Sequence, residues 1–182
     1  EVGEDPAYRR DVDPLLEALL DGAPEGPRLD IGCGDGRLLD QFAAFGVDSS
    51  LDLVRGGESR RTVIADLARL PFAEAQWSVS FVVLVVEQLA EVGQFFTEAA
   101  RVTASGGVLA LGVNHPIYTA PGSGPFLDPE DGEVLWRWGS YLTPGSTREP
   151  AGSGSVEFHH RSMADLLSAA AAAGWQLERV IE

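Results

Sequence analysis

The sequence contains no lysine, since all 13 of its basic residues are arginine. They stand against 28 acidic residues, which gives a formal net charge of −15. A surface this acidic repels the phosphates of nucleic acids and the headgroups of anionic lipids. We therefore expect neither nucleic acid nor a membrane surface as a partner.

Cysteine and long apolar runs are also scarce. The single cysteine, Cys33, excludes an internal disulfide, and the sequence has no Cys/His spacing of the zinc-finger kind. Acidic residues between positions 128 and 133 lack the later ligands of a calcium-binding loop, so no metal site is predicted. The longest apolar run, 81–86, is too short for a bilayer, and the first ten residues do not resemble a signal peptide. These absences predict a cytoplasmic protein.

The 182 residues, 45% of them hydrophobic, suffice for one domain with its own core. Apolar periodicity alternates between strand and helix, which predicts a doubly wound α/β sheet with mostly parallel strands. Strands are expected at 28–31, 46–48, 62–65, 79–86, 108–113 and 175–181. Helices are expected at 13–22, 38–45, 50–54, 95–105 and 162–173.

The segment 114–160 interrupts this alternation. Its glycines and prolines are mixed with aromatic residues such as Tyr118, Trp136, Trp138 and Tyr141. We interpret it as an insertion into a single domain spanning 1–182, with the role of a lid over a substrate. Its aromatic side chains would either line an apolar or cation-binding pocket or give the insertion a small core of its own.

The most specific motif is the segment 28–36, RLDIGCGDG, in which three glycines follow a strand. The spacing differs from the G-x-G-x-x-G of dinucleotide-binding turns, because Arg37 stands at the third glycine position, and a P-loop ending is missing. Glycines before a helix let backbone N–H groups approach a carboxylate, and Asp30 would face an ammonium group. Together they suit a zwitterionic amino-acid group. Asp48, at the end of the next strand, is placed to accept both hydroxyls of a ribose.

This motif resembles the glycine turn of the class I S-adenosylmethionine-dependent methyltransferases, in particular those acting on small molecules. The resemblance continues through the segments 46–50, 65–72, 77–89 and 99–107. It covers residues 28–113 closely and residues 156–181 more loosely.

The resemblance implies a Rossmann-like, three-layer α/β/α fold, S-adenosylmethionine as cofactor and a small-molecule methyl acceptor. It assigns cofactor-binding residues along the chain. The methionine end would lie at Asp30, Gly32, Cys33, Gly34 and Gly36, the ribose at Asp48 and Ser49, the adenine at Asp66 and Leu67, and the methyl group near the backbone of Val82 and Val83.

Candidate catalytic residues follow the fifth strand. His115 and Tyr118 could act as a base for the acceptor, although a surface histidine in a proline-stabilised loop would have the same sequence. His159 and His160 would point to opposite faces of a strand, so only one of them would face a substrate. Tyr8 and Arg9 would either cover the cofactor or belong to a frayed terminus.

Some positions depart from the family pattern. Ser78 replaces a usual aspartate, Gln88 replaces a histidine that often follows the position of Glu87, and the segment before Asp48 is short. The family's last, antiparallel strand has no counterpart after Ile181. A non-catalytic binding or regulatory protein of the same fold is therefore the alternative, while the glycine spacing disfavours a nicotinamide-dependent oxidoreductase. The acceptor and the oligomeric state stay open.

Overall fold

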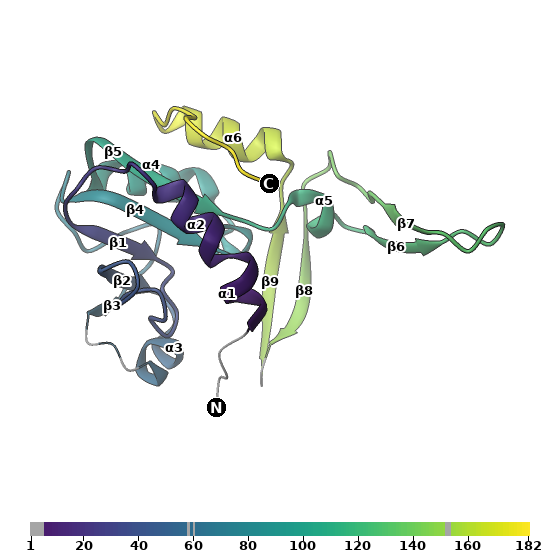
Figure 1. The fold of residues 1–182 in the computed structure, drawn as a ribbon, viewed down its shortest axis with the longest axis horizontal. Helices are drawn as coiled ribbons and strands as arrows, with labels where there is room; N and C mark the ends of the chain where they lie inside the picture. The colour runs from purple at the N-terminus through teal and green to yellow at the C-terminus, as the bar shows by residue number, and fades with distance from the viewer. Residues whose placement is uncertain (1–5, 58, 60, 152–153) are drawn as a thin grey trace.

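The computed structural model describes residues 6–57, 59, 61–151 and 154–182 (Figure 1). Its centre is a parallel five-stranded sheet with the order β3-β2-β1-β4-β5. The strands are β1 (Arg28–Ile31), β2 (Ala44–Asp48), β3 (Thr62–Ile64), β4 (Trp77–Val83) and β5 (Thr103–Gly112). β1 and β4 are buried almost throughout, and for β4 this confirms what the apolar run that begins at Val79 predicts for a strand covered on both faces.

Helices cover both faces of this sheet. Leu16 and Leu20 of α2 (Asp13–Leu20) share one apolar cluster with Phe42 and Phe81. Phe95 and Phe96 of α4 (Val92–Val102) share a second cluster with Leu166 of α6 (Met163–Ala172). The predicted three-layer, doubly wound fold is confirmed (Figure 1). Two further helices lie nearer the glycine turn and β2, namely α1 (Pro6–Asp11) and α3 (Leu51–Gly56).

The helix predicted after the glycine turn is wrong. Residues 37–43 form successive turns, in which Phe42 N–H donates to Leu38 O at 3.0 Å but Ala43 N–H donates to Asp40 O, three residues back. Ala43 then adopts a positive φ of 52°. Because so few residues link Gly36 to β2, the chain must reverse before a regular helix can develop.

The other boundary errors lie at the end of β4, around β5 and in the C-terminal segment. The strand predicted to run to Val86 ends at Val83, because Leu84 adopts a positive φ of 56° and turns the chain. The helix α4 ends at Val102, so Gly106 and Gly107 belong to β5, where a shift in register relative to Trp77 and Val79 accommodates them. Residues 175–181 form no strand. Side chains hold this segment instead, since Trp175 Nε1 donates to Phe96 O at 3.1 Å and Arg179 to Ala18 O at 2.7 Å. Within the described ranges, β5 is therefore an edge strand.

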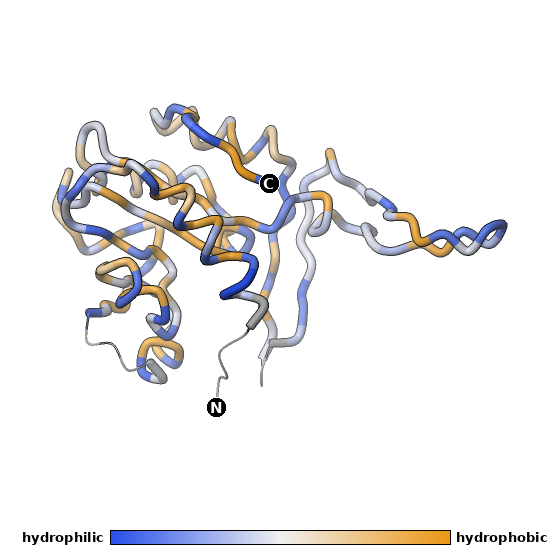
Figure 2. The backbone as a smooth tube through the Cα atoms, viewed as in Figure 1, coloured by the Kyte–Doolittle hydropathy of each residue, from blue (hydrophilic) through white to orange (hydrophobic). Residues whose placement is uncertain are grey.

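The insertion contains more regular structure than its sequence predicts. After α5 (Pro116–Thr119) come two antiparallel hairpins, β6 (Gly124–Leu127) with β7 (Val134–Arg137), and β8 (Gly145–Ala151) with β9 (Gly154–His160). The β6–β7 hairpin projects far from the sheet (Figure 1), and its tip is hydrophilic (Figure 2). Trp138 is 67% exposed, so the rings do not all gather into a separate small core. No helix in the described part of the chain is long and apolar enough to cross a bilayer.

Candidate functional site at the carboxyl edge of the sheet

The glycine turn is fixed to the neighbouring strand by backbone hydrogen bonds. Gly32 and Cys33 N–H groups both donate to Val47 O, at 2.7 and 3.1 Å. Gly32 has a φ of 86°, and a Cβ atom there would lie 2.4 Å from a methyl carbon of Val85. Glycine is therefore required at this position for both the backbone conformation and the close approach of the segment after β4.

Asp48 joins two turns at the end of β2. Its Oδ2 accepts the Gly34 N–H at 2.8 Å, and its Oδ1 accepts the Ser50 N–H at 2.7 Å. Each carboxylate oxygen has a second lone pair, so the same side chain can still accept hydroxyl groups. Asp48 thus both shapes the glycine turn and presents a fixed acceptor pair, while Ser49 beside it is exposed.

Asp30 lies in β1 below the turn and is only 2% exposed. Burial, with a smaller contribution from the nearby charge of Asp48, raises the pKa of Asp30 to about 8, while Arg37 opposes the shift. A cation arriving at the turn would favour the ionised form of Asp30. The site therefore holds two acidic side chains close together, which suits a positively charged group.

The N-terminal helix packs against this turn. The guanidinium carbon of Arg37 lies 3.9 Å from the ring centroid of Tyr8, a cation–π contact. Burial raises the pKa of Tyr8 to about 12, with Asp30 among the smaller contributors. Tyr8 thus packs beside the predicted cofactor site, whereas Arg9 lies on an exposed part of α1.

Two further predicted segments meet the same edge of the sheet, because all five strands are parallel. Asp66 follows β3 and is exposed, with its Oδ1 accepting the Ala68 N–H at 2.9 Å, and the adjacent Leu67 is buried. Val82 and Val83 end β4 and are buried as well. The predicted cofactor residues therefore share one edge, from the turn after β1 to the end of β4.

Cys33 has a packing role in this turn. Its side chain is 7% exposed, and burial raises the pKa of its thiol to about 12, with the charges of Asp30 and Asp48 adding to the effect. A Cβ atom at Gly46 would lie 2.5 Å from its sulfur. The thiol is thus held neutral and enclosed, unsuited to nucleophilic chemistry.

The predicted catalytic pair lies just after β5. His115 caps α5, since its Nδ1 accepts the Ile117 N–H at 3.2 Å, and its Nε2 lies 3.5 Å from a carboxylate oxygen of Glu182. Tyr118 is 61% exposed and packs edge-on against Trp136, with 5.0 Å between the ring centroids. The two residues are neighbours, 6.4 Å apart by ring centroids, but both have structural contacts.

Some of the other aromatic and histidine candidates make structural contacts, and others lie at a cavity or on the surface. His160 is buried, and its ring nitrogens lie 3.2 Å from Thr119 Oγ1 and 2.8 Å from Tyr141 O. The Tyr141 hydroxyl accepts the Met163 N–H at 3.1 Å. His159 instead lines a small cavity, so the expected division between the two histidines agrees with their surroundings.

Two cavities flank the ends of β4 and β5. One, of about 80 Å³, is apolar and is bounded by α2 and by residues such as Val83, Leu84 and Val113. The other, of about 20 Å³, contains the polar residues Glu87 and Arg161 and also touches Val113. Leu84 between them has a positive φ of 56°, which turns the chain sharply as β4 ends.

Sequence reasoning missed the roles of Glu87 and Arg161. Arg161 donates to Ala90 O at 2.6 Å and also to Leu89 O, which fastens the end of β9 to the short helix η1 (Val86–Gln88) and the residues after it. Glu87 is buried although its residue type is usually exposed. The only available signal was a charged residue next to an otherwise apolar run.

Comparison with known proteins shows which proteins this chain resembles. The family profile described as "Methyltransferase domain" matches residues 29–111. A curated malonyl-[acyl-carrier protein] O-methyltransferase from Pseudescherichia vulneris is 31% identical over 112 residues, which cover 57% of this chain and 44% of that protein. The chain spans about half the length of the curated relatives it matches.

Solved structures are similar over most of the chain. An S-adenosylmethionine-dependent methyltransferase from Mesorhizobium loti has a TM-score of 0.78 at 25% identity, covering 91% of this chain and 81% of that one. A structure from Listeria monocytogenes also has a TM-score of 0.78, at 21% identity, and covers 92% of this chain and 85% of its own. The second likeness shows a common fold.

Proposed function

We propose that this chain is a class I, S-adenosylmethionine-dependent methyltransferase that transfers a methyl group to a small molecule. The proposal starts from the match of residues 29–111 to the methyltransferase-domain family. When bound, the cofactor supplies an electrophilic methyl group on a sulfonium. An acceptor atom forms a bond to that carbon as the carbon–sulfur bond breaks, which leaves S-adenosylhomocysteine. Any proton displaced from the acceptor passes to a base or to water.

The observation that supports this proposal most directly is the arrangement around Asp48. This carboxylate holds the Gly34 and Ser50 N–H groups and keeps lone pairs for a pair of hydroxyls. All three glycines of the turn beside it have a positive φ, and a Cβ atom at Gly34 would meet only Leu53 Cδ1, at 4.0 Å, so a ligand can approach the backbone there. Nearby, Asp30 offers a buried carboxyl group to an ammonium group. The residues present therefore fit an amino-acid-bearing nucleoside.

The chain's own contribution is positioning. Asp30, Gly32, Gly34 and Gly36 would hold the methionine end, and Asp66 with Leu67 would hold the adenine. The N–H groups of the three glycines already donate within the protein, to Val47 O, Asp48 Oδ2 and Cys33 O, so the shape of the turn rather than these donors would make the contact. Orienting the acceptor against the methyl group can account for roughly 7–11 kcal/mol of a reaction barrier. His115 or Tyr118 would serve as the base where the acceptor must lose a proton, which typically adds about 10² to 10⁴ in rate.

The insertion 114–160 is proposed as the substrate lid of a single domain. It begins where β5 ends, and Arg161 ties its last strand to the segment after β4. Both attachment points lie at the carboxyl edge, where open α/β sheets bind ligands. A cytoplasmic location belongs to the same proposal and is supported by the single, buried thiol of Cys33.

Calorimetric titration with S-adenosylmethionine and S-adenosylhomocysteine tests the proposal. Wild-type protein should bind both. Asp48→Ala should weaken binding by about 1–3 kcal/mol, because charge-assisted hydrogen bonds are lost. Asp48→Asn, which keeps the side-chain shape, serves as a second variant, and Asp52→Ala in the exposed part of α3 is the matched control.

Two results would contradict the proposal. One is folded wild-type protein that ignores both ligands at millimolar concentration. The other is binding without methyl transfer to any component of a metabolite extract supplied with methyl-labelled cofactor, which would favour the non-catalytic binding protein. Titration with NAD separates the oxidoreductase alternative.

A further inference from the structure

We propose that Glu87 recognises a hydrogen-bond donor, an amine or hydroxyl group, on the methyl acceptor. The recognition point is the small cavity beside η1, at the carboxyl edge of β4 and β5. This inference rests on the proposed function, because that function identifies the ligand as the methyl acceptor. The geometry that supports it is independent of the cofactor residues.

Glu87 is a buried acidic side chain with one oxygen unpaired. It is 8% exposed, and its Oε1 accepts the Asn114 N–H at 2.7 Å. Its Oε2 is enclosed and has no hydrogen-bond partner among the described residues. A buried polar atom without a partner has lost its hydration with no hydrogen bond in exchange, so such an atom calls for an explanation in terms of function.

Neighbouring side chains do not meet this need. Arg161 lines the cavity as well, but its guanidinium donates to the carbonyl groups of Val86, Leu89 and Ala90. Leu166 and Pro116 contribute apolar walls. The arrangement therefore fixes the turn that carries Glu87 while leaving one carboxyl oxygen for another donor.

The size of the cavity limits what can enter. Its volume of about 20 Å³ holds one water molecule or the tip of a ligand, such as a hydroxyl or amino group. The larger apolar cavity, of about 80 Å³, shares Val113 with it but is otherwise lined by α2 and by the ends of β4 and β5, on the other face of the sheet. A ligand group that reaches Glu87 would therefore rest against the apolar walls of Leu166 and Pro116. A carboxylate or phosphate at the same point would face the acidic side chain of Glu87 and be disfavoured.

Two isomeric probes test this point without knowledge of the natural acceptor. Butan-1-ol has a hydroxyl donor, whereas its isomer methyl propyl ether has no donor. A third probe, butylammonium, is a cationic donor. Each is titrated into ¹⁵N-labelled protein saturated with S-adenosylhomocysteine. The readout is the backbone amide signal of Asn114, because Glu87 accepts that N–H.

The expected result is a saturable shift of the Asn114 signal with butanol or butylammonium and none with the ether. Glu87→Gln should weaken the binding of the donor probes at least tenfold. The amide oxygen of the new side chain can still accept the Asn114 N–H, but an NH₂ group replaces the free acceptor oxygen. Glu91→Gln, an exposed site four residues later, should behave as wild type. Glu87→Asp tests whether a shortened carboxyl group restores part of the affinity.

Equal responses to butanol and the ether, or donor binding unchanged in Glu87→Gln, would overturn the inference. The affinity of each variant for S-adenosylhomocysteine is measured on the same samples. If the affinity for S-adenosylhomocysteine is unchanged while the donor probes no longer bind, the effect of Glu87→Gln is assigned to the acceptor site. If the wild type fails to bind S-adenosylhomocysteine, the proposed function fails, while titration of the probes without it still reports on Glu87.

Discussion

Individual side chains at the glycine turn combine two tasks, holding the backbone and presenting charge. Asp48 shows both, because the Gly34 and Ser50 N–H groups already occupy part of its hydrogen-bonding capacity. Asp30 has no such compensation from a described donor, which is why burial dominates its titration. A buried carboxyl group without hydrogen-bond donors lowers the stability of the folded protein when it ionises, and a bound cation offsets that loss.

The raised pKa of Asp30 predicts a pH dependence of folding. The pKa of Asp30 is about 8 in the folded protein, against an ordinary aspartate value of 3.8, so the folded protein binds the proton more tightly than the unfolded chain does. The contribution of Asp30 to stability is therefore most favourable below pH 4 and is lost as the pH rises toward 8. Between pH 5 and 8.5 the loss should be on the order of a few kcal/mol.

Urea unfolding of wild type and Asp30→Asn at pH 5 and pH 8.5 measures this effect. The variant lacks the titrating group, so its free energy of unfolding should fall less over this range. Asp21→Asn, on an exposed residue, controls for the loss of one negative charge. Equal pH dependence in wild type and Asp30→Asn would show that Asp30 ionises normally in the folded protein.

At the scale of elements, the junction between β9 and α6 depends on a single arginine. Arg161 donates to Leu89 O and Ala90 O, which follow η1, and to Val86 O, which also accepts the Leu89 N–H at 3.2 Å. Ser162 then caps α6 in a reciprocal hydrogen-bonding arrangement with Asp165. The capping box was predictable from local sequence, but the arginine contacts join residues more than 70 positions apart.

Arg161→Ala should lower the free energy of unfolding by about 1–3 kcal/mol, because partly buried carbonyl groups lose their donors. Chemical unfolding at neutral pH measures this change. Arg148→Ala on the preceding strand is the matched control, and its exposed pair with Glu157 predicts a change of less than about 1 kcal/mol. Comparable losses in both variants would show that Arg161 does not join these elements.

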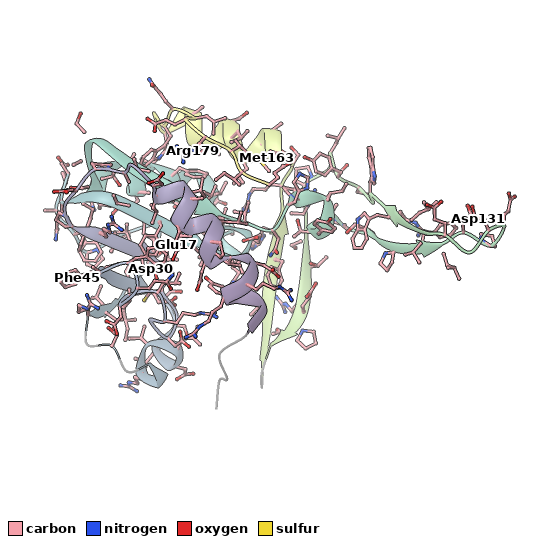
Figure 3. All side chains as sticks on the ribbon, in the orientation of Figure 1. Glu17, Asp30, Phe45, Asp131, Met163 and Arg179 are labelled. Carbon is pink, nitrogen blue, oxygen red and sulfur yellow. The ribbon has the colours of Figure 1, made fainter. Side chains whose placement is uncertain are left out.

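Over the whole molecule, the sheet and the β6–β7 hairpin are nearly separate in space. Asp131 lies at the far tip of this hairpin, well away from Asp30 in the sheet (Figure 3). Most hairpin side chains are exposed, including Leu127 at 63% and Val134 at 69%. The folding of the parallel sheet therefore gains little from this arm.

Replacing residues 125–136 by Asn-Gly tests this separation. Gly124 and Arg137 are facing partners in the hairpin, so a two-residue turn can join them. The thermal midpoint and the affinity for S-adenosylhomocysteine should stay close to wild type. Loss of cooperative unfolding, monitored by circular dichroism, would mean that the arm belongs to the core.

The sequence by itself determined the strand–helix alternation and the glycine turn, because apolar periodicity and glycine spacing act over short distances. It also placed Asp48 and Asp66 after successive strands, and parallel pairing brings those strand ends to one edge. Only the tertiary structure decided that residues 37–43 form turns, that 175–181 stay unpaired and that Glu87 is buried with a free oxygen. These features depend on how segments that are distant in the sequence pack against one another, and a local sequence pattern contains no information about that packing.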